Sequence, residues 1–186
     1  MRPIIVTEFV TLDGVMQDPG SWQEGYRSPE AGRFKRQELF EISALLLGRV
    51  TYDEFVGYWP TASETGDFGE RMNALPKLVA TSQPGPLAWN AARLEGDVPE
   101  AVRALKRQDG GSLLTYGSGA LVRTLLRHGL VDELRLMVYP IAAGRGRRLF
   151  GQDRVPLKLK DRREFAGGVL LLTYAPAAPD PAPNGG

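Results

Sequence analysis

The chain has 186 residues, enough for one well-buried core and few for two, so a single domain is expected. Its 23 basic and 22 acidic residues nearly cancel, which gives no indication of nucleic acid or an anionic membrane as partner. The lack of cysteine excludes disulfides and thiolate metal sites, and the single histidine, His128, lacks the partners that a metal site or catalytic triad requires. No apolar run approaches the roughly 20 residues of a membrane span and no signal peptide begins the chain, so a cytoplasmic protein is expected.

The first predicted element is a buried strand over residues 3–12, where the run PIIVTEFVTL is apolar and rich in β-branched residues. The turn-forming pair Asp13 and Gly14 ends this strand. Residues 15–30 form a long loop that carries Trp22. Two interpretations stay open for this loop: a lid or pocket wall, or a connection whose tryptophan plugs the edge of the core.

A helix and a short strand follow the loop. The helix is predicted to begin at Ser28, because Pro29 suits the first helical position. Its apolar face is imperfect and consists of Phe34, Leu39, Phe40 and Ile42. Residues 44–47 are fully apolar and predict a short buried strand.

This strand continues directly into the sequence GRVTY, which predicts a strand-to-helix turn at residues 48–52. Gly48 frees the backbone, Thr51 can cap the helix or hydrogen-bond a phosphate, and Arg49 brings a planar positive charge. The alternative is an ordinary helix cap with a surface arginine.

The middle of the chain predicts an irregular, partly helical link over residues 67–75 and a strand over residues 76–80. Thr81 and Ser82 follow this strand, where their hydroxyls would hold an adenosine-ribose phosphate or simply make a turn. Residues 84–96 are expected to form a loop with a short strand.

The next helix begins at Asp97, because Glu100 three residues later completes a capping pattern. Beyond it, residues 113–116 predict another strand, and the glycine-rich residues 117–119 lead into a further helix. The apolar face of that helix consists of Leu121, Val122, Leu125 and Leu126. Gly129 suits the left-handed residue that ends it.

The free N–H groups and positive dipole end of a helix that begins at glycines favour an anionic phosphate. A tight turn that needs glycines for its backbone shape explains residues 117–119 equally well. Turns of this kind follow two different strands, and in an open α/β sheet ligands lie beyond the carboxyl ends of the strands. Both turns could therefore face one crevice that holds a dinucleotide.

The last part of the chain predicts a strand over residues 133–139 and a flexible basic loop over residues 141–148. Residues 155–165 and 169–174 then predict a hairpin that completes the sheet. From residue 176 to residue 186 the sequence PAAPDPAPNGG predicts a disordered tail.

Taken in order, four motifs carry a family resemblance: TLDG at residues 11–14, GRVTY at 48–52, KLVATS at 77–82 and the long segment from 117 to 150. Together they resemble the reductase domain of bacterial riboflavin biosynthesis and its stand-alone relatives in the dihydrofolate reductase-like superfamily. The resemblance covers about residues 3 to 175. Each motif alone is weak, and the specificity lies in the set.

The resemblance implies a three-layer α/β fold with a mixed, mostly parallel central sheet flanked by helices. Residues 1–175 would form this single reductase domain and residues 176–186 the tail. It also implies an NADPH cofactor, hydride transfer to a small conjugated heterocycle of pterin or pyrimidine type, and a homodimer. No metal is expected, because the chain has no cysteine and a single histidine. The activity would be related to that of the 5-amino-6-(5-phosphoribosylamino)uracil reductase.

The resemblance also assigns roles to particular residues. It implies that Gly48, Arg49 and Thr51 approach the cofactor phosphates, Thr81 and Ser82 the 2′-phosphate side, and Gly117, Ser118, Gly119, Ala120 and Leu121 the pyrophosphate. Asp13 would border the nicotinamide, where it would serve as the proton donor or act only as a turn former.

Two features depart from the riboflavin reductases. Those enzymes carry a substrate-binding glutamate just before the second phosphate turn, and this chain has Tyr116 there. Their fused zinc deaminase would need cysteine ligands, which this chain lacks. A different substrate is therefore expected. A basic residue at Gln83 would have strengthened a 2′-phosphate contact, so the choice between NADPH and NADH stays open.

Hydride transfer needs no protein nucleophile, because the cofactor carries the chemistry and the protein supplies position and electrostatics. A reductase therefore fits a sequence without a triad or a metal set. The alternatives are a non-catalytic dinucleotide-binding sensor or interaction module, and a structural dimer whose glycines serve only the shape of the backbone.

Overall fold

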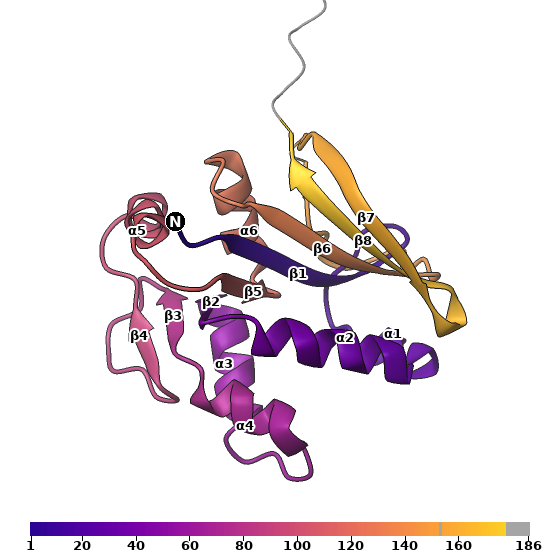
Figure 1. Ribbon diagram of the computed structural model, residues 1–186, viewed down its shortest axis with the longest axis horizontal. Coiled ribbons are helices and arrows are strands. Elements are labelled where there is room, and N and C mark those ends of the chain that lie inside the picture. The colour runs from indigo at the N-terminus through magenta and orange to yellow at the C-terminus, as the bar shows by residue number, and fades with distance from the viewer. Residues whose placement is uncertain (153, 178–186) are drawn as a thin grey trace, which may run out of the picture.

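The computed structural model describes residues 1–152 and 154–177, and its centre is an eight-stranded sheet (Figure 1). The strand order is β4-β3-β2-β5-β1-β6-β8-β7. The strands are β1 (Ile4–Thr11), β2 (Ala44–Gly48), β3 (Lys77–Ala80), β4 (Ala91–Arg93), β5 (Leu113–Tyr116), β6 (Glu133–Tyr139), β7 (Leu157–Phe165) and β8 (Val169–Pro176).

The sheet is mixed and mostly parallel, as the sequence predicted. All the pairings from β4 across to β6 are parallel, and only the terminal hairpin of β7 and β8 runs antiparallel. Strand β1 pairs with β5 only as far as Thr7 opposite Tyr116, whereas it pairs with β6 as far as Thr11 opposite Tyr139. Because β5 ends early, the last part of β1 has no neighbouring strand on that side among the residues described, and this edge borders a cavity.

Helices cover both faces of the sheet. They are α1 (Gly20–Gln23), α2 (Pro29–Phe40), α3 (Arg49–Tyr58), α4 (Gly66–Ala74), α5 (Val98–Arg107) and α6 (Gly119–Arg127), with 3₁₀ turns η1 (Glu24–Tyr26) and η2 (Ala166–Gly168). The leucines of β2 show why both faces must be covered. Leu45, Leu46 and Leu47 are all 0% exposed, although successive side chains of a strand point to opposite faces.

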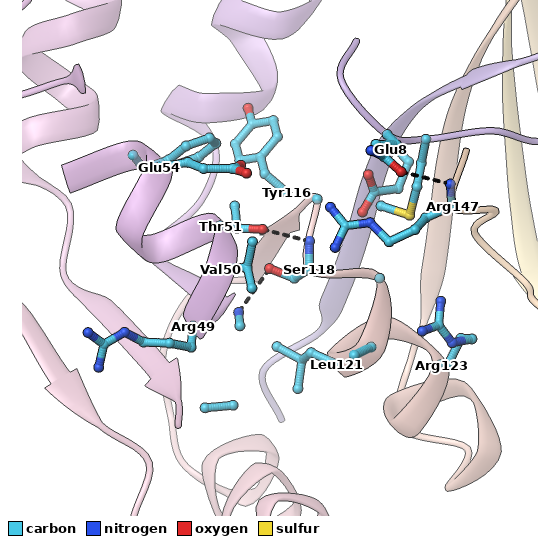
Figure 2. A pocket seen from close by; sticks show the side chains of 18 of the residues that line it. Glu8, Arg49, Val50, Thr51, Glu54, Tyr116, Ser118, Leu121, Arg123 and Arg147 are labelled. Carbon is cyan, nitrogen blue, oxygen red and sulfur yellow. Dashed lines mark hydrogen bonds between the residues drawn. The ribbon is translucent and has the colours of Figure 1, made fainter. Parts of the chain in front are cut away.

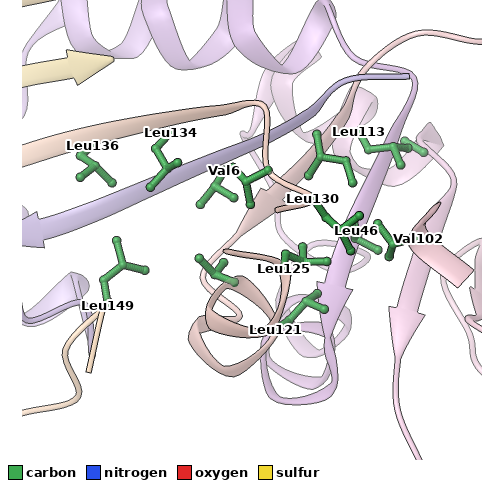
Figure 3. Packing of buried hydrophobic residues seen from close by; sticks show 14 of the residues in the cluster. Val6, Leu46, Val102, Leu113, Leu121, Leu125, Leu130, Leu134, Leu136 and Leu149 are labelled. Carbon is green, nitrogen blue, oxygen red and sulfur yellow. The ribbon is translucent and has the colours of Figure 1, made fainter. Parts of the chain in front are cut away.

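Each face has its own hydrophobic core. Leu45 and Leu47 join a cluster with Leu39 of α2, Tyr52 of α3 and Met72 of α4. Leu46 joins the opposite cluster, which contains Val102 of α5 and Leu121, Val122 and Leu125 of α6 (Figure 3). The predicted three-layer α/β architecture is therefore confirmed.

The predicted helix ends are confirmed by their capping contacts. Ser28 Oγ accepts a hydrogen bond from Ala31 N at 3.2 Å, and Asp97 Oδ1 accepts one from Glu100 N at 3.2 Å. Gly129 has a φ of +62° after α6, the left-handed conformation that glycine adopts without a steric penalty. These local signals were sufficient to position three helices.

Several local predictions were wrong, for element boundaries and for one apolar side chain. Residues 66–74 form a regular helix, α4, where an irregular and only partly helical link was expected over residues 67–75. Phe40, predicted on the apolar face of its helix, is 42% exposed, and the Arg36 and Arg71 guanidinium groups lie 4.4 and 5.9 Å from the centre of its ring. Strand β7 begins at Leu157 rather than residue 155.

The predicted start of the tail also needs correction. Pro176 belongs to β8 and lies opposite Leu157, and Ala177 N donates to the carbonyl oxygen of Pro156 at 2.9 Å. The remainder of the predicted disordered tail, residues 178–186, lies outside the described residues. Within the described part of the chain, no helix is long and apolar enough to cross a membrane.

Candidate functional site

A cavity of about 850 Å³ opens beyond the carboxyl ends of β2, β3 and β5 and alongside β1 (Figure 2). It is lined by segments that are far apart in sequence: residues 7–9 of β1, 16–19 of the following loop, 48–51 at the start of α3, and 116–121 at the start of α6. Both predicted phosphate turns thus border one cavity. A volume of this size is typical of small-molecule and cofactor sites, which measure roughly 300–1,000 Å³.

Two reciprocal hydrogen bonds join the two turns. Ser118 Oγ accepts from Gly48 N at 2.9 Å, and Thr51 Oγ1 accepts from Ser118 N at 2.8 Å, as the dashed lines in Figure 2 show. We call this pair of bonds the turn clasp. Because the clasp occupies the N–H groups of Gly48 and Ser118, these two groups orient the turns rather than offer donors to a ligand.

The glycines allow the clasp to form. Gly117 and Ser118 both adopt left-handed backbone conformations, with φ of +53° and +56°. A Cβ atom on Gly117 would lie 2.9 Å from Thr51 Oγ1, so a larger residue would separate the two turns. At Gly117, glycine is therefore needed for the shape of the backbone. A role in binding an anionic ligand concerns the residues after it.

The first turn of α6 supplies further backbone donors at the cavity. The first hydrogen bond of the helix runs from Val122 N to Ser118 O, so the N–H groups of Gly119, Ala120 and Leu121 precede the regular helical bonds. All three residues line the cavity. A Cβ atom on Gly119 would lie 2.7 Å from Met16 Sδ, so the loop after β1 packs directly on this turn.

Positive side chains reach the cavity from three elements. Arg49 belongs to α3, Arg123 to α6 and Arg147 to the loop after β6. Arg49 Nε donates to both carboxylate oxygens of Asp53 at 2.8 Å, while Arg123 Nη1 donates to the Leu149 carbonyl at 3.3 Å. These contacts hold two of the arginines at the rim, where their charge favours an anionic ligand.

The wall formed by β1 and β5 is buried and polar. Glu8 is 5% exposed and Tyr116 is 9% exposed, and both line the cavity. Burial raises the pKa of the Glu8 carboxyl well above its usual value, and it outweighs the opposing effects of the Lys35 ammonium and the Gly117 N–H. Burial also raises the pKa of the Tyr116 hydroxyl, so both groups favour their neutral forms.

A charged cluster from α2 lies behind this wall. Lys35 Nζ donates to Thr7 Oγ1 at 2.8 Å and to Glu38 Oε2, and it lies 4.6 Å from the centre of the Tyr116 ring. Glu38 also accepts from Arg135 at 3.3 Å. Because Glu38 is paired with two cations, it supports the wall from behind rather than facing the cavity.

The structure places Asp13 away from the cavity lining. Its carboxylate accepts from Thr11 Oγ1 at 2.6 Å, from Ala143 N at 3.0 Å and from Gly144 N at 2.9 Å. These hydrogen bonds, with that of Thr11 largest, lower the pKa of Asp13. The position favours the turn-forming role of Asp13, since an ionised carboxylate with three donors has no proton to give.

The predicted 2′-phosphate residues, Thr81 and Ser82, also lie outside the cavity lining. Thr81 and Ser82 follow β3, but only the preceding Ala80 lines the cavity, and Thr81 Oγ1 accepts from Gln83 N at 3.1 Å in a local turn. Their contact with a 2′-phosphate stays a prediction.

The long loop after β1 combines both interpretations that its sequence allowed. Met16 lines the cavity as a wall. Trp22 instead packs edge-on against Tyr139 at 5.1 Å between ring centres, in a small core with Phe165.

Sequence reasoning missed Glu8, the buried acid of the cavity. The available signal was a single carboxylate inside the otherwise apolar run of β1, since charged residues are almost never fully buried without a partner. A buried ionisable group of this kind, on a strand beside a crevice, marks a candidate functional residue.

The fold and cavity define a class: a three-layer α/β domain with a ligand crevice where two glycine-containing turns meet. The sequence profile of the RibD C-terminal domain matches residues 2–171. The chain therefore belongs to the RibD C-terminal domain family.

Individual relatives agree with this assignment. The Bacillus subtilis (strain 168) protein YyaP is 28% identical over 179 residues, which cover 93% of this chain and 94% of YyaP. A structure from Shewanella sp. PV-4, described as a candidate riboflavin biosynthesis protein, is similar with a TM-score of 0.72 and 19% identity over 95% of this chain and 99% of that one.

A second structure is the diaminohydroxyphosphoribosylaminopyrimidine deaminase/5-amino-6-(5-phosphoribosylamino)uracil reductase of Thermotoga maritima. It matches with a TM-score of 0.65 and 18% identity over 95% of this chain but only 57% of that one. At these identities the structures establish the dihydrofolate reductase-like fold, and the activity is argued separately below.

Proposed function

We propose that the protein is an NADPH-dependent reductase that transfers a hydride to a small conjugated heterocycle of pterin or pyrimidine type. The observation that carries the proposal is the meeting of the two glycine-containing turns, at Gly48 and Gly117, on one cavity of about 850 Å³. Membership of the RibD C-terminal domain family supports it, and so does the similar Thermotoga maritima structure, whose name includes a 5-amino-6-(5-phosphoribosylamino)uracil reductase.

The residues at the cavity suit a dinucleotide. The first turn of α6 presents backbone N–H groups and a positive dipole end, which favour phosphate oxygens. Arg49 and Arg123 add positive charge at the rim. When bound, the dihydronicotinamide would supply a hydride, so the protein itself needs only to position the substrate and provide a proton.

The inner part of the cavity suits a flat heterocycle. Phe9 and Phe55 contribute aromatic rings, and Glu8 and Tyr116 contribute polar atoms. An apolar slot with a few polar groups is the usual design of a small-molecule site. The substrate would therefore lie against β1 and β5, with the cofactor phosphates toward α6.

Thermal unfolding with NADPH, with NADH and without ligand tests the cofactor assignment. Binding to the native state raises stability, by about 2.7 kcal/mol when the ligand is at 100 times its Kd. We expect a shift with NADPH that Arg49→Ala reduces. Arg103→Ala is the matched control, because Arg103 is a helix arginine paired with Glu100 and lies outside the cavity lining. The proposal would be overturned if neither NADPH nor NADH raised the melting temperature.

The alternative of a non-catalytic dinucleotide-binding module is tested by turnover. Such a module would bind NADPH but would not oxidise it with 5-amino-6-(5-phosphoribosylamino)uracil or 7,8-dihydrobiopterin as acceptors. The predicted homodimer is a separate proposal, and light scattering coupled to size-exclusion chromatography would test it.

A further inference from the structure

Glu8 is the acidic side chain of β1, a strand that is otherwise almost entirely buried and largely apolar. Its neighbours Ile4, Val6 and Val10 on the same face belong to the core under α5 and α6. Burying a carboxyl in such a place costs free energy unless a partner compensates. The position therefore needs an explanation that packing does not give.

The carboxyl is incompletely bonded. Among the described residues, Glu8 Oε1 is buried and has no hydrogen-bond partner. Tyr116 OH, on the adjacent strand, is buried and lacks a partner in the same way. Thr7 lies opposite Tyr116 in the parallel register, so Tyr116 shares the face of Thr7, and the Glu8 side chain points to the other face of the sheet. Both residues line the cavity, and Figure 2 shows Glu8 on the β1 side of it.

Burial and the surrounding charges together set the protonation of this carboxyl. The ionisable groups that act on it or share its cavity are Lys35, Glu38, Asp18, Arg49, Glu54, Tyr116, Arg123 and Arg147. Lys35 is committed to Glu38 and Thr7, so it does not neutralise Glu8 by a direct ion pair. A neutral, protonated carboxyl is the form that this environment favours.

We propose that Glu8 is the acid that delivers the proton to the substrate in the reduction described above, and that its free oxygen faces the substrate heterocycle. The proposal rests on the proposed function and adds the residue that completes it. Asp13 does not serve this role, because its carboxylate is bound by three donors outside the cavity lining.

The step balances as follows. The dihydronicotinamide gives a hydride to the carbon of a C=N or C=C bond in the substrate, and the π electron pair of that bond moves to the neighbouring atom. The O–H bond of Glu8 then breaks as a new N–H or C–H bond forms on that atom. The carboxylate that remains recovers a proton from water at the mouth of the cavity.

Two Glu8 variants and a matched control test this assignment. Glu8→Gln keeps the shape of the side chain but removes the acidic proton, and Glu8→Asp keeps the acid on a shorter side chain. Thr115→Val is the control, because Thr115 Oγ1 is also buried without a partner among the described residues but does not line the cavity. NADPH binding is measured by thermal shift, and NADPH oxidation is followed with the two acceptors named above.

We expect Glu8→Gln to bind NADPH with an affinity within about threefold of wild type and to lose about 10²- to 10⁴-fold in turnover, the range of general acid catalysis. Glu8→Asp should retain part of the turnover, and Thr115→Val all of it. Because the acid must be protonated, wild-type turnover should fall as pH rises through the pKa of Glu8, and Glu8→Gln should lose this limb of the pH profile.

Infrared difference spectroscopy gives a readout that needs no turnover. The wild-type protein at neutral pH should show the carbonyl band of a protonated carboxylic acid, and Glu8→Gln should lack it while Thr115→Val keeps it. An ionised Glu8 in this experiment would overturn the proposal. So would NADPH binding accompanied by unchanged turnover in Glu8→Gln. Failure of the wild-type protein to bind NADPH or NADH would instead overturn the proposed function itself.

Discussion

Removing the hydroxyl of Thr51 should separate the two turns that form the cavity. In Thr51→Val the side chain keeps its volume, but Ser118 N loses the acceptor that lies 2.8 Å away. Thr51 is 6% exposed, so water cannot easily replace the lost bond. An unsatisfied backbone donor of this kind costs about 1–3 kcal/mol, and we expect a loss of that size in the free energy of unfolding.

Thr51→Ser supplies the control for this prediction. It keeps the hydroxyl and removes one methyl group, which is worth about 0.8 kcal/mol when buried. Ser118→Ala removes the other bond of the turn clasp, from Gly48 N at 2.9 Å. If the two bonds act as a unit, the double variant should lose less than the sum of the single losses by at least about 0.5 kcal/mol.

Urea unfolding followed by the fluorescence of the three tryptophans measures these differences. A Thr51→Val variant as stable as wild type would refute the reasoning, because it would mean that the hydroxyl contributes nothing beyond packing. Weaker NADPH binding in Thr51→Val than in Thr51→Ser would further link the clasp to the shape of the site.

Three further predictions concern other parts of the fold. Lys77 is 1% exposed and burial lowers its pKa to about 8, so protonation of this side chain opposes folding. The free energy of unfolding should therefore rise between pH 8 and about pH 10.5, by up to about 1.4 kcal/mol per pH unit. Lys77→Met should remove this rise in urea titrations. Gly117→Ala should lower the melting temperature more than Gly129→Ala. Both positions have positive φ, but only a Cβ atom at Gly117 would meet Thr51, at 2.9 Å. Equal falls in melting temperature would contradict this. Asp13→Asn should speed tryptic cleavage in the arginine-rich loop of residues 141–148, because Ala143 N and Gly144 N donate to the Asp13 carboxylate; an unchanged cleavage rate would argue that Asp13 does not anchor this loop.

Much of the fold was predictable because its signals are local. Capping residues such as Ser28 and Asp97 fix where helices begin, and Gly129 fixes where one ends. The apolar run of β2 predicted burial on both faces. The failures also have local causes: Phe40 matched the apolar spacing of α2 but lies where arginine side chains, not the core, cover it.

The site was predictable only in part. The sequence could show that glycine turns follow two strands, but it could not show that Ser118 and Thr51 bond each other's turns across 67 residues. Such contacts depend on how parallel strands are ordered in the sheet. The same limit hid Glu8, because its cavity exists only where β5 ends before β1 does.

The buried wall of the cavity bears on the choice of substrate. The riboflavin reductases that the sequence resembles carry a glutamate just before the second phosphate turn, and here that position holds Tyr116. The acid comes instead from Glu8 on the adjacent strand, where burial favours its protonated form. A neutral carboxyl donates a hydrogen bond, whereas an ionised carboxylate only accepts. We therefore expect this site to prefer substrates that present an acceptor, such as an imine nitrogen, over those that present amino groups to a carboxylate.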